Sequence, residues 1–333
     1  MSENDWEDGF STGIAVGSTA ITEGGYNIGD IILSSNMESI SPIVWSLDTS
    51  YNSVKVDTDG NVYASYNEGV YKYDSDGVLL WENIEVGHAV DLDLDSSSNV
   101  YVAYDQGVGI KTVRKLNSSG TELWSNTSVG YANGIAVDSL GNVYVAYNSG
   151  VRKYSSSGTL IWSKTDVTSA NSIAVDSSDN VYVAYSSSTK KVRKLDSSGN
   201  ELWSKTDYPN GYDITVDSSD NVYVAYSTAA SYNYPSLRKL DSSGTELWYK
   251  KEIGSNYSVA VDSSGNVYAA YPPFGIRKLD SSGNDIWYFP INGARDVAPD
   301  SLGNVYIASI SSIYSNNMGL IKINEDLSYT ITS

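Results

Sequence analysis

The sequence contains no cysteine and a single histidine, His88, among its 333 residues. The missing cysteine excludes disulfide bonds, thiolate metal sites and thiol nucleophiles, and one histidine cannot supply a histidine-rich metal cluster. No apolar run approaches the roughly 18 residues that a membrane-spanning helix needs. The first residues, Met-Ser-Glu-Asn-Asp-Trp-Glu-Asp, are acidic where a classical secretion signal is basic and then apolar, so we expect no such signal.

Positive charge is scarce as well. The 21 lysines and arginines stand against 40 acidic residues, which gives a net charge of −19. This balance argues against a nucleic-acid partner, because nucleic-acid binders usually present a basic face. It also argues against an electrostatic anchor on anionic membrane, and we expect no membrane insertion. An acidic surface of this kind fits a protein that stays soluble in high salt or outside a cell.

Internal repetition is what the sequence has in abundance. The tripeptide Asn-Val-Tyr returns at intervals of about 40 residues, and tryptophan keeps the same rhythm. The tripeptides begin at Asn61, Asn99, Asn142, Asn180, Asn221, Asn266 and Asn304, and the tryptophans are Trp45, Trp81, Trp124, Trp162, Trp203, Trp248 and Trp287. A fixed period of this length indicates that each copy is one supersecondary unit of a repeat fold.

The best-preserved copy predicts four strands, which we name A to D in chain order. They are short runs rich in Val, Ile, Leu, Tyr and Trp at residues 173–175, 181–185, 192–195 and 201–204. Asp-Ser-Ser turns join A to B and C to D, because an aspartate opens a type I turn and a following Gly or Asn accepts the left-handed conformation. Two hairpins in about 40 residues predict one four-stranded antiparallel blade of an all-β propeller.

The number of blades depends on the two ends of the chain. Seven Asn-Val-Tyr copies indicate seven blades, with the strand around Trp45 closing the ring against the last C strand. However, the apolar runs at residues 320–323 and 329–332 would give the last repeat a D strand of its own. Residues 13–46 would then supply a worn blade for Trp45.

We favour eight blades over seven. This interpretation divides the chain into an acidic N-terminal arm at residues 1–12 and a single propeller domain at residues 13–333. The domain would start with a degenerate blade at residues 13–48, and its regular repeats would run from about residue 52 onward. In the seven-blade alternative, residues 1–40 form a separate arm.

Two segments resemble known repeat families. Residues 135–146, Ile-Ala-Val-Asp-Ser-Leu-Gly-Asn-Val-Tyr-Val-Ala, resemble the A–B hairpin of NHL-type propeller repeats. Residues 192–203, Val-Arg-Lys-Leu-Asp-Ser-Ser-Gly-Asn-Glu-Leu-Trp, are similar to the tryptophan-docking hairpin of PQQ-like repeats, although the docking turn of the family is typically one residue longer. The resemblance covers residues 50–325 and implies a propeller, with eight blades in the quinoproteins. It leaves the function open, since these families include enzymes, scaffolds and adhesins.

The recurring tryptophans and aspartates have structural interpretations. A tryptophan at one place in every outer strand fills the space between neighbouring blades. Aspartates open the turns, and calcium at Asp57 and Asp59 or at Asp74 and Asp76 is the weaker alternative, because neither segment has the 12-residue EF-hand frame ending in glutamate. We therefore expect no metal and no cofactor, with calcium as the remaining candidate.

Catalysis has little support in the sequence. The quinoprotein resemblance implies a vicinal disulfide that a chain without cysteine cannot form, and His88 has no nucleophile-elbow pattern near it. No residue pattern points to paired glycosidase carboxylates. We expect a protein that is not an enzyme.

Binding residues are expected on one face of the disc. In a propeller the A–B and C–D turns share one face, and the B–C and D–A links share the other. The B–C links vary most in length, and rigid scaffolds place binding residues on such loops. Tyrosine combines contact area with low entropy cost and stacks on sugar rings. The candidate binding residues are Tyr131, Tyr208, Tyr212, Tyr232, Tyr234, Tyr257 and Tyr314. Ordinary solvated loops are the alternative.

The first functional hypothesis is a non-enzymatic binding propeller. It would be a surface or tail component of a virion, from a virus of a halophilic archaeon, that recognises a host-surface glycan or protein and is extracellular after release. Trp6 and Phe10 in the acidic arm would contact other structural proteins of the assembly. The alternative is a PQQ-like scaffold for protein partners in a multi-subunit assembly, and the third hypothesis is a quinoprotein-type or hydrolytic enzyme.

Overall fold

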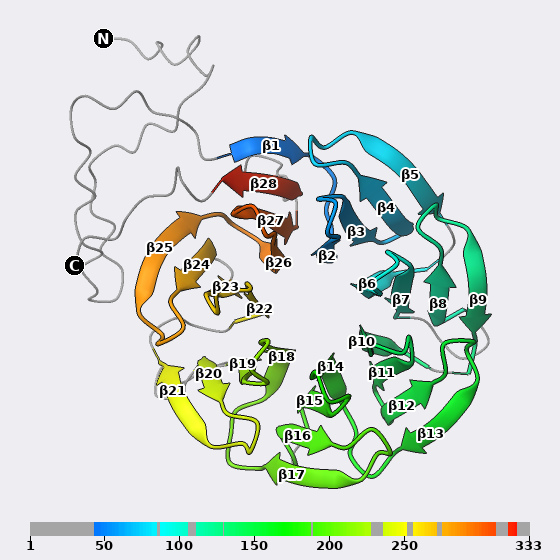
Figure 1. Ribbon diagram of the computed structural model, residues 1–333, viewed down its shortest axis with the longest axis vertical. Helices are drawn as coiled ribbons and strands as arrows, with labels where there is room; N and C mark the ends of the chain where they lie inside the picture. The colour runs from blue at the N-terminus through cyan, green and yellow to red at the C-terminus, as the bar shows by residue number, and fades with distance from the viewer. Residues whose placement is uncertain are drawn as a thin grey trace, which may run out of the picture.

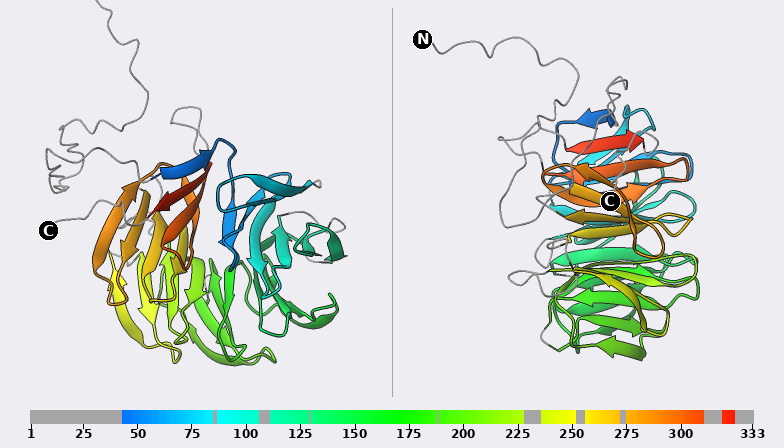
Figure 2. Two further views of the ribbon diagram at one scale, coloured as in Figure 1. Left: turned by 45° about the horizontal axis from the view of Figure 1, so that its top comes forward. Right: turned by 90° about the vertical axis from the view of Figure 1, so that its left-hand side faces the viewer.

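Seven four-stranded antiparallel sheets stand around one axis like the blades of a propeller (Figure 1). The computed structural model describes residues 43–84, 87–105, 111–128, 130–187, 189–227, 236–251, 256–271, 275–310 and 319–324. Seen from the side, the blades form a disc (Figure 2). Within these ranges no helix is long or apolar enough to span a membrane.

Each blade runs from an innermost A strand to a D strand at the rim. The A strands are β2 (Ser53–Val56), β6 (Ala89–Leu94), β10 (Ala132–Val137), β14 (Ala170–Val175), β18 (Gly211–Val216), β22 (Ser258–Val261) and β26 (Ala294–Pro299). The B strands are β3 (Val62–Tyr66), β7 (Val100–Tyr104), β11 (Val143–Tyr147), β15 (Val181–Tyr185), β19 (Val222–Tyr226), β23 (Val267–Tyr271) and β27 (Asn304–Ser309). The C strands are β4 (Gly69–Tyr73), β8 (Val113–Leu116), β12 (Gly150–Tyr154), β16 (Val192–Leu195), β20 (Leu237–Leu240), β24 (Gly275–Leu279) and β28 (Leu320–Asn324). The D strands are β5 (Leu79–Ile84), β9 (Glu122–Asn126), β13 (Leu160–Lys164), β17 (Glu201–Lys205), β21 (Glu246–Lys250), β25 (Asp285–Pro290) and β1 (Ile43–Leu47). We number the blades one to seven from the sheet that begins with β2.

The prediction of four-stranded propeller blades is confirmed, but the prediction of eight blades with a degenerate first blade is wrong. Strand β1, which contains Trp45, pairs antiparallel with β28 and is the D strand of the seventh blade. The N-terminal segment therefore completes the last blade instead of starting one of its own. Residues 1–42 and 325–333, which include the predicted arm and the proposed extra D strand, lie outside the described residues.

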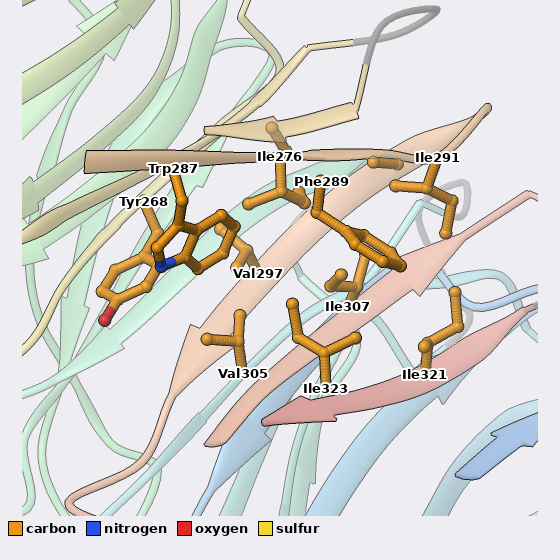
Figure 3. Packing of buried hydrophobic residues seen from close by; sticks show 12 residues of the cluster. Tyr268, Ile276, Trp287, Phe289, Ile291, Val297, Val305, Ile307, Ile321 and Ile323 are labelled. Atoms are coloured by element: carbon orange, nitrogen blue, oxygen red, sulfur yellow. The ribbon is translucent and has the colours of Figure 1, made fainter. Parts of the chain in front are cut away.

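A separate apolar core fills each of the seven interfaces between adjacent blades. The B strands supply much of it, because side chains on both faces of a middle strand meet a neighbouring blade. Between the sixth and seventh blades, Trp287 and Phe289 pack toward Ile307 and Ile323 (Figure 3). Burial of this apolar surface on both faces of every blade is the main stabilising term of the ring.

The tryptophans of the rim dock on the next blade, as predicted. The indole nitrogen of Trp81 in the first blade donates to the carbonyl oxygen of Ser118 in the second, at 3.0 Å. Its ring lies on Gly120, where an added Cβ would come within 2.8 Å of the indole. Gly120 has a φ of +81°, so glycine serves here both the turn and the close approach of the ring.

Candidate functional site

The two ends of the blades differ in how variable they are. At one end, which we call the turn face, the A–B and C–D turns lie side by side, and Gly60 of the first turn is close to Ser75 of the second. At the other end, the loop face, the D–A link meets the start of the B–C link: the backbone N–H of Ser227 donates to the carbonyl of Asn210 at 2.9 Å. The predicted grouping of turns and links therefore holds.

The aspartates of the turn face are structural. Asp57 accepts hydrogen bonds from the backbone N–H of Asp59, from Asn61 and from the Tyr63 hydroxyl, with Lys72 at 3.8 Å. Burial alone would raise the pKa of Asp57, but these hydrogen bonds and the Lys72 charge lower it. Asp74 accepts from the backbone of Asp76 in the same way, at 3.0 Å. Two of the four carboxylates proposed as calcium ligands, those of Asp57 and Asp74, are thus engaged by donors of the chain itself.

On the loop face, one position of the repeat carries different residues in different blades. It lies five residues before the turn aspartate, at or next to the start of the A strand, and we call its seven residues the loop-face ring. They are Asn52, Val90, Asn133, Asn171, Tyr212, Tyr257 and Arg295. Three asparagines tie neighbouring blades together, because the side-chain amides of Asn52, Asn133 and Asn171 donate to backbone carbonyls of the next blade at 2.9, 2.8 and 2.6 Å.

Two predicted binding residues meet in this ring. Tyr212 of the fifth blade and Tyr257 of the sixth have ring centroids 5.2 Å apart and planes inclined by 33°. Tyr257 is 48% exposed, and Tyr212 is partly buried. The two rings form a tilted pair, and Tyr257 presents an aromatic side chain to solvent where the first four blades have asparagine or valine.

Arg295 follows in the ring on the seventh blade and is exposed. Its guanidinium donates a hydrogen bond to Oδ1 of Asn52 in the first blade at 3.2 Å. This bond orients the Arg295 side chain, and its acceptor carries no charge. Most arginines of the C strands have carboxylate partners instead, such as Glu122 for Arg114 and Asp285 for Arg277. Among the described carboxylates, none forms an ion pair with Arg295.

The remaining predicted tyrosines do not join the pair. Tyr131 is half exposed on a different part of the loop face and has a φ of +49°. Tyr208 packs under Arg238, whose guanidinium carbon lies 4.0 Å from the ring centroid, and burial raises the pKa of Tyr208. The other predicted residues, Tyr232, Tyr234, Tyr314, Trp6 and Phe10, lie outside the described residues.

A set of carboxylates closer to the axis was not predicted. Asp91, Asp213 and Asp296 stand four residues before a turn aspartate, where other blades have Ser or Gly. Each accepts the backbone N–H of another A strand, at 2.9 Å from Ile135, 2.8 Å from Val259 and 2.8 Å from Val54. These carboxylates therefore connect neighbouring blades by hydrogen bonds, as do the asparagines that stand one position earlier in the repeat.

Lys55 supplies the positive charge of this inner set. Burial would lower the pKa of Lys55, but Asp93, Asp296, Asp91 and Asp213 surround the ammonium and raise it instead. Burial raises the pKa of Asp91 to about 7, although Lys55 and the N–H of Ile135 oppose this shift. The sequence does carry a signal for these carboxylates and for Arg295. It appears when the repeats are aligned and compared at the position four residues before the turn aspartate and at the loop-face ring.

Comparison with known proteins gives one family and many structures. The family model described as outer membrane protein assembly factor BamB, a PQQ-like model, matches residues 109–231 and 148–309. No curated protein matches the chain. Three solved structures show the same fold at low identity. They are U3-55K (TM-score 0.73, 11% identity, 85% of this chain and 97% of that one), the RRP9 WD40 repeats (0.71, 11%, 84% and 96%) and a chain of the mitotic checkpoint complex (0.65, 12%, 89% and 99%).

Proposed function

The chain belongs to the PQQ-like repeat family described as outer membrane protein assembly factor BamB, and from this premise we propose that it is a non-enzymatic binding propeller whose loop face holds the ligand. A propeller of this family provides a rigid ring on which a binding surface can be built. The family and the fold leave the ligand open, so the ligand has to be argued from the site.

The observation that carries the proposal is the break in the repeat at the loop-face ring. Positions that serve the fold recur in every blade, as the rim tryptophans and turn aspartates do. The packed pair of Tyr212 and Tyr257, followed by Arg295, stands in three consecutive blades where the other four have asparagine or valine. Exposed tyrosine and arginine side chains are typical of recognition surfaces, and Tyr257 and Arg295 are both exposed.

The finer part of the proposal concerns the setting. We place the propeller on the surface or tail of a virion that is exposed to high salt, where the loop face recognises a host-surface glycan or protein. The net charge of −19 supports a high-salt environment, and the tyrosine pair supports a ligand with flat apolar faces such as a sugar. The carboxylates nearest the axis hold backbone N–H groups, which supports a structural role for them and a protein without catalytic activity.

A scaffold for protein partners is the second candidate. The family description names an assembly factor, and one structurally similar chain comes from a multi-subunit checkpoint complex. In this case the loop face, with the N-terminal residues Trp6 and Phe10, would contact other subunits.

The two candidates are separated by one binding experiment. Purified full-length protein is applied in high salt to host cells and to an array of envelope glycans, beside the variant Tyr212→Ala/Tyr257→Ala. Binding that the double substitution abolishes supports glycan recognition by the loop face. Binding that survives the substitution contradicts the assignment of the site. Absence of glycan and cell binding, together with capture of subunits of the same particle, favours the scaffold.

A further inference from the structure

We infer that the ligand of the loop-face ring is an acidic sugar, whose ring stacks on the tyrosine pair while its carboxylate binds Arg295. This inference rests on the proposed function and deepens it, because it names the chemical class that the site selects.

The sugar part of the inference comes from the shape of the tyrosine pair. The two ring centroids are 5.2 Å apart and the ring planes are inclined by 33°, so Tyr212 packs against Tyr257. Tyr257 stays 48% exposed although Tyr212 packs against it. The C–H groups on one face of a pyranose carry partial positive charge, and they suit the electron-rich face of a tyrosine ring. An exposed tyrosine face that is supported by a second ring matches a flat sugar better than it matches a lone acidic side chain of a protein.

The acidic part of the inference, a carboxylate on the ligand, comes from the exposure and hydrogen bonding of Arg295. The hydrogen bond to Oδ1 of Asn52 orients the guanidinium but does not neutralise it, and the exposed side chain keeps further N–H donors for a ligand. Asp296, its neighbour in sequence, does not serve as a counter-ion. The Asp296 carboxylate accepts hydrogen bonds from Ser53, Val54 and Ser258, at 2.6–2.8 Å, toward the axis.

The order of Tyr212, Tyr257 and Arg295 around the axis connects the sugar part of the inference with the acidic part. Strands β18, β22 and β26 are neighbours in this order around the ring (Figure 1), and the loop-face ring residues of their blades are Tyr212, Tyr257 and Arg295. We therefore place the sugar on the exposed Tyr257, with its carboxylate directed toward the next position of the loop-face ring, which Arg295 occupies. Arginine binds carboxylates through two parallel hydrogen bonds, which selects a planar anion over a neutral hydroxyl.

The charge of the whole protein gives this site an unusual salt dependence. A net charge of −19 repels an anionic saccharide at long range, whereas the Arg295 contact acts at short range. Added salt screens the repulsion first. We expect the association rate for an acidic oligosaccharide to rise between low and moderate salt, and the rate for a neutral one to stay constant.

The test uses two acidic probes and their uncharged counterparts. Pentagalacturonate and sialyllactose are titrated into the full-length protein by calorimetry, each beside its carboxyl methyl ester. The variants are Arg295→Gln, Arg295→Lys and Tyr257→Ala. Arg152→Gln is the matched control, because Arg152 bonds neutral groups such as Ser128 and belongs to β12 of the third blade, not to the loop-face ring. Thermal unfolding shows that each variant is folded.

We expect at least one acid to bind about tenfold more tightly than its ester, the ratio that one charge-assisted contact supplies. Arg295→Gln should remove this preference, Arg295→Lys should restore part of it, and Arg152→Gln should leave it unchanged. Tyr257→Ala should weaken acid and ester alike. Equal binding of acid and ester, or a preference that survives in Arg295→Gln, overturns the inference. If neither acid binds while neutral glycans do, the acidic-sugar inference fails and the proposed function stands. If no glycan binds at all, both fail.

Discussion

Ile43 lies opposite Ile323 in the seventh blade, where β1 and β28 pair antiparallel. Ile323 is buried in the core against the sixth blade, and Ile43 packs on the same cluster. Two residues further along β1, the indole nitrogen of Trp45 donates to the carbonyl of Ser75 in the first blade, at 3.0 Å. One short strand therefore completes the last blade and also docks on the first, and this double contact closes the ring.

A pair of cysteines tests this closure directly. The chain has no cysteine of its own, so Ile43→Cys/Ile323→Cys introduces the only pair that can form a disulfide. Opposed residues of an antiparallel pair have the Cα separation that a disulfide needs. We expect the bond to form on mild oxidation and to raise the unfolding temperature, because it closes almost the whole chain into one loop. Mass spectrometry of the unreduced protein detects the bond.

An eight-bladed ring gives the opposite result. There β1 would pair within a blade of its own, and the two introduced cysteines would remain free thiols.

The docking of tryptophan on glycine makes a second prediction. Gly120→Ala places a methyl group 2.8 Å from the Trp81 ring in a backbone with a φ of +81°. We expect a loss of about 2–4 kcal/mol in the free energy of unfolding, from left-handed strain together with overpacking. Gly303→Ala is the matched control, because Gly303 has the same φ and nothing lies within 4 Å of its added Cβ. It should cost only about 1–2 kcal/mol. Equal losses in urea unfolding would contradict the docking role.

The inner carboxylates predict how stability changes with pH. The pKa of Asp91 is about 7 in the folded chain, above the ordinary value of an aspartate, so the native state holds its proton more tightly than the unfolded state does. This contribution is complete below about pH 4 and is lost as the pH rises from there through about 7. We expect the wild type to lose about 1–2 kcal/mol between pH 5 and pH 8 from this group, an amount reduced by its partial exposure to solvent.

Asp91→Asn tests the assignment. The amide cannot ionise, so the variant should be less stable overall but should lack this slope in unfolding experiments across the same range. A slope that persists in Asp91→Asn would assign it to other groups.

The turn aspartates predict a further difference in stability. Asp176 accepts hydrogen bonds from the backbone N–H of Asn180 at 2.8 Å and from the Tyr182 hydroxyl at 2.9 Å, with the Lys194 ammonium at 3.4 Å. Asp176→Ala leaves the hydroxyl and the ammonium without this acceptor, and we expect a loss of about 3–5 kcal/mol. In the control Asp196→Ala, only exposed turn contacts are lost, and the effect should be clearly smaller. Thermal unfolding of the two variants decides this.

The repeat made most of the fold predictable. Strand positions, turn chemistry and tryptophan docking follow from residues that recur along the chain, and six of the seven rim tryptophans make the same hydrogen bond to the next blade. The number of blades did not follow, since the segment around Trp45 has the pattern of a D strand whichever blade it completes. Only the pairing of Ile43 in this segment with Ile323 decides between seven and eight blades, and these two residues are far apart in the sequence.

The site was predictable in part. Tyrosine in the links indicated Tyr212 and Tyr257, and the structure packs their rings together with centroids 5.2 Å apart. The same reasoning included Tyr208, which packs against Arg238 because its ring meets the guanidinium of the adjoining strand. Arg295 was missed, because the prediction followed loop length and aromatic content instead of the one repeat position that varies among the A strands.

The central claim is that this protein binds its ligand with the loop face. The most direct test measures the affinity of the full-length protein for the glycan that it binds most tightly on an array. A loop-face variant, Tyr257→Ala/Arg295→Gln, is compared with a turn-face variant, Leu140→Ala/Leu302→Ala, whose side chains are 71% and 82% exposed. We predict that the loop-face variant loses about tenfold or more in affinity, as is typical of removed recognition side chains, and that the turn-face variant binds like the wild type. Loss of binding in the turn-face variant with full binding in the loop-face variant would contradict the account.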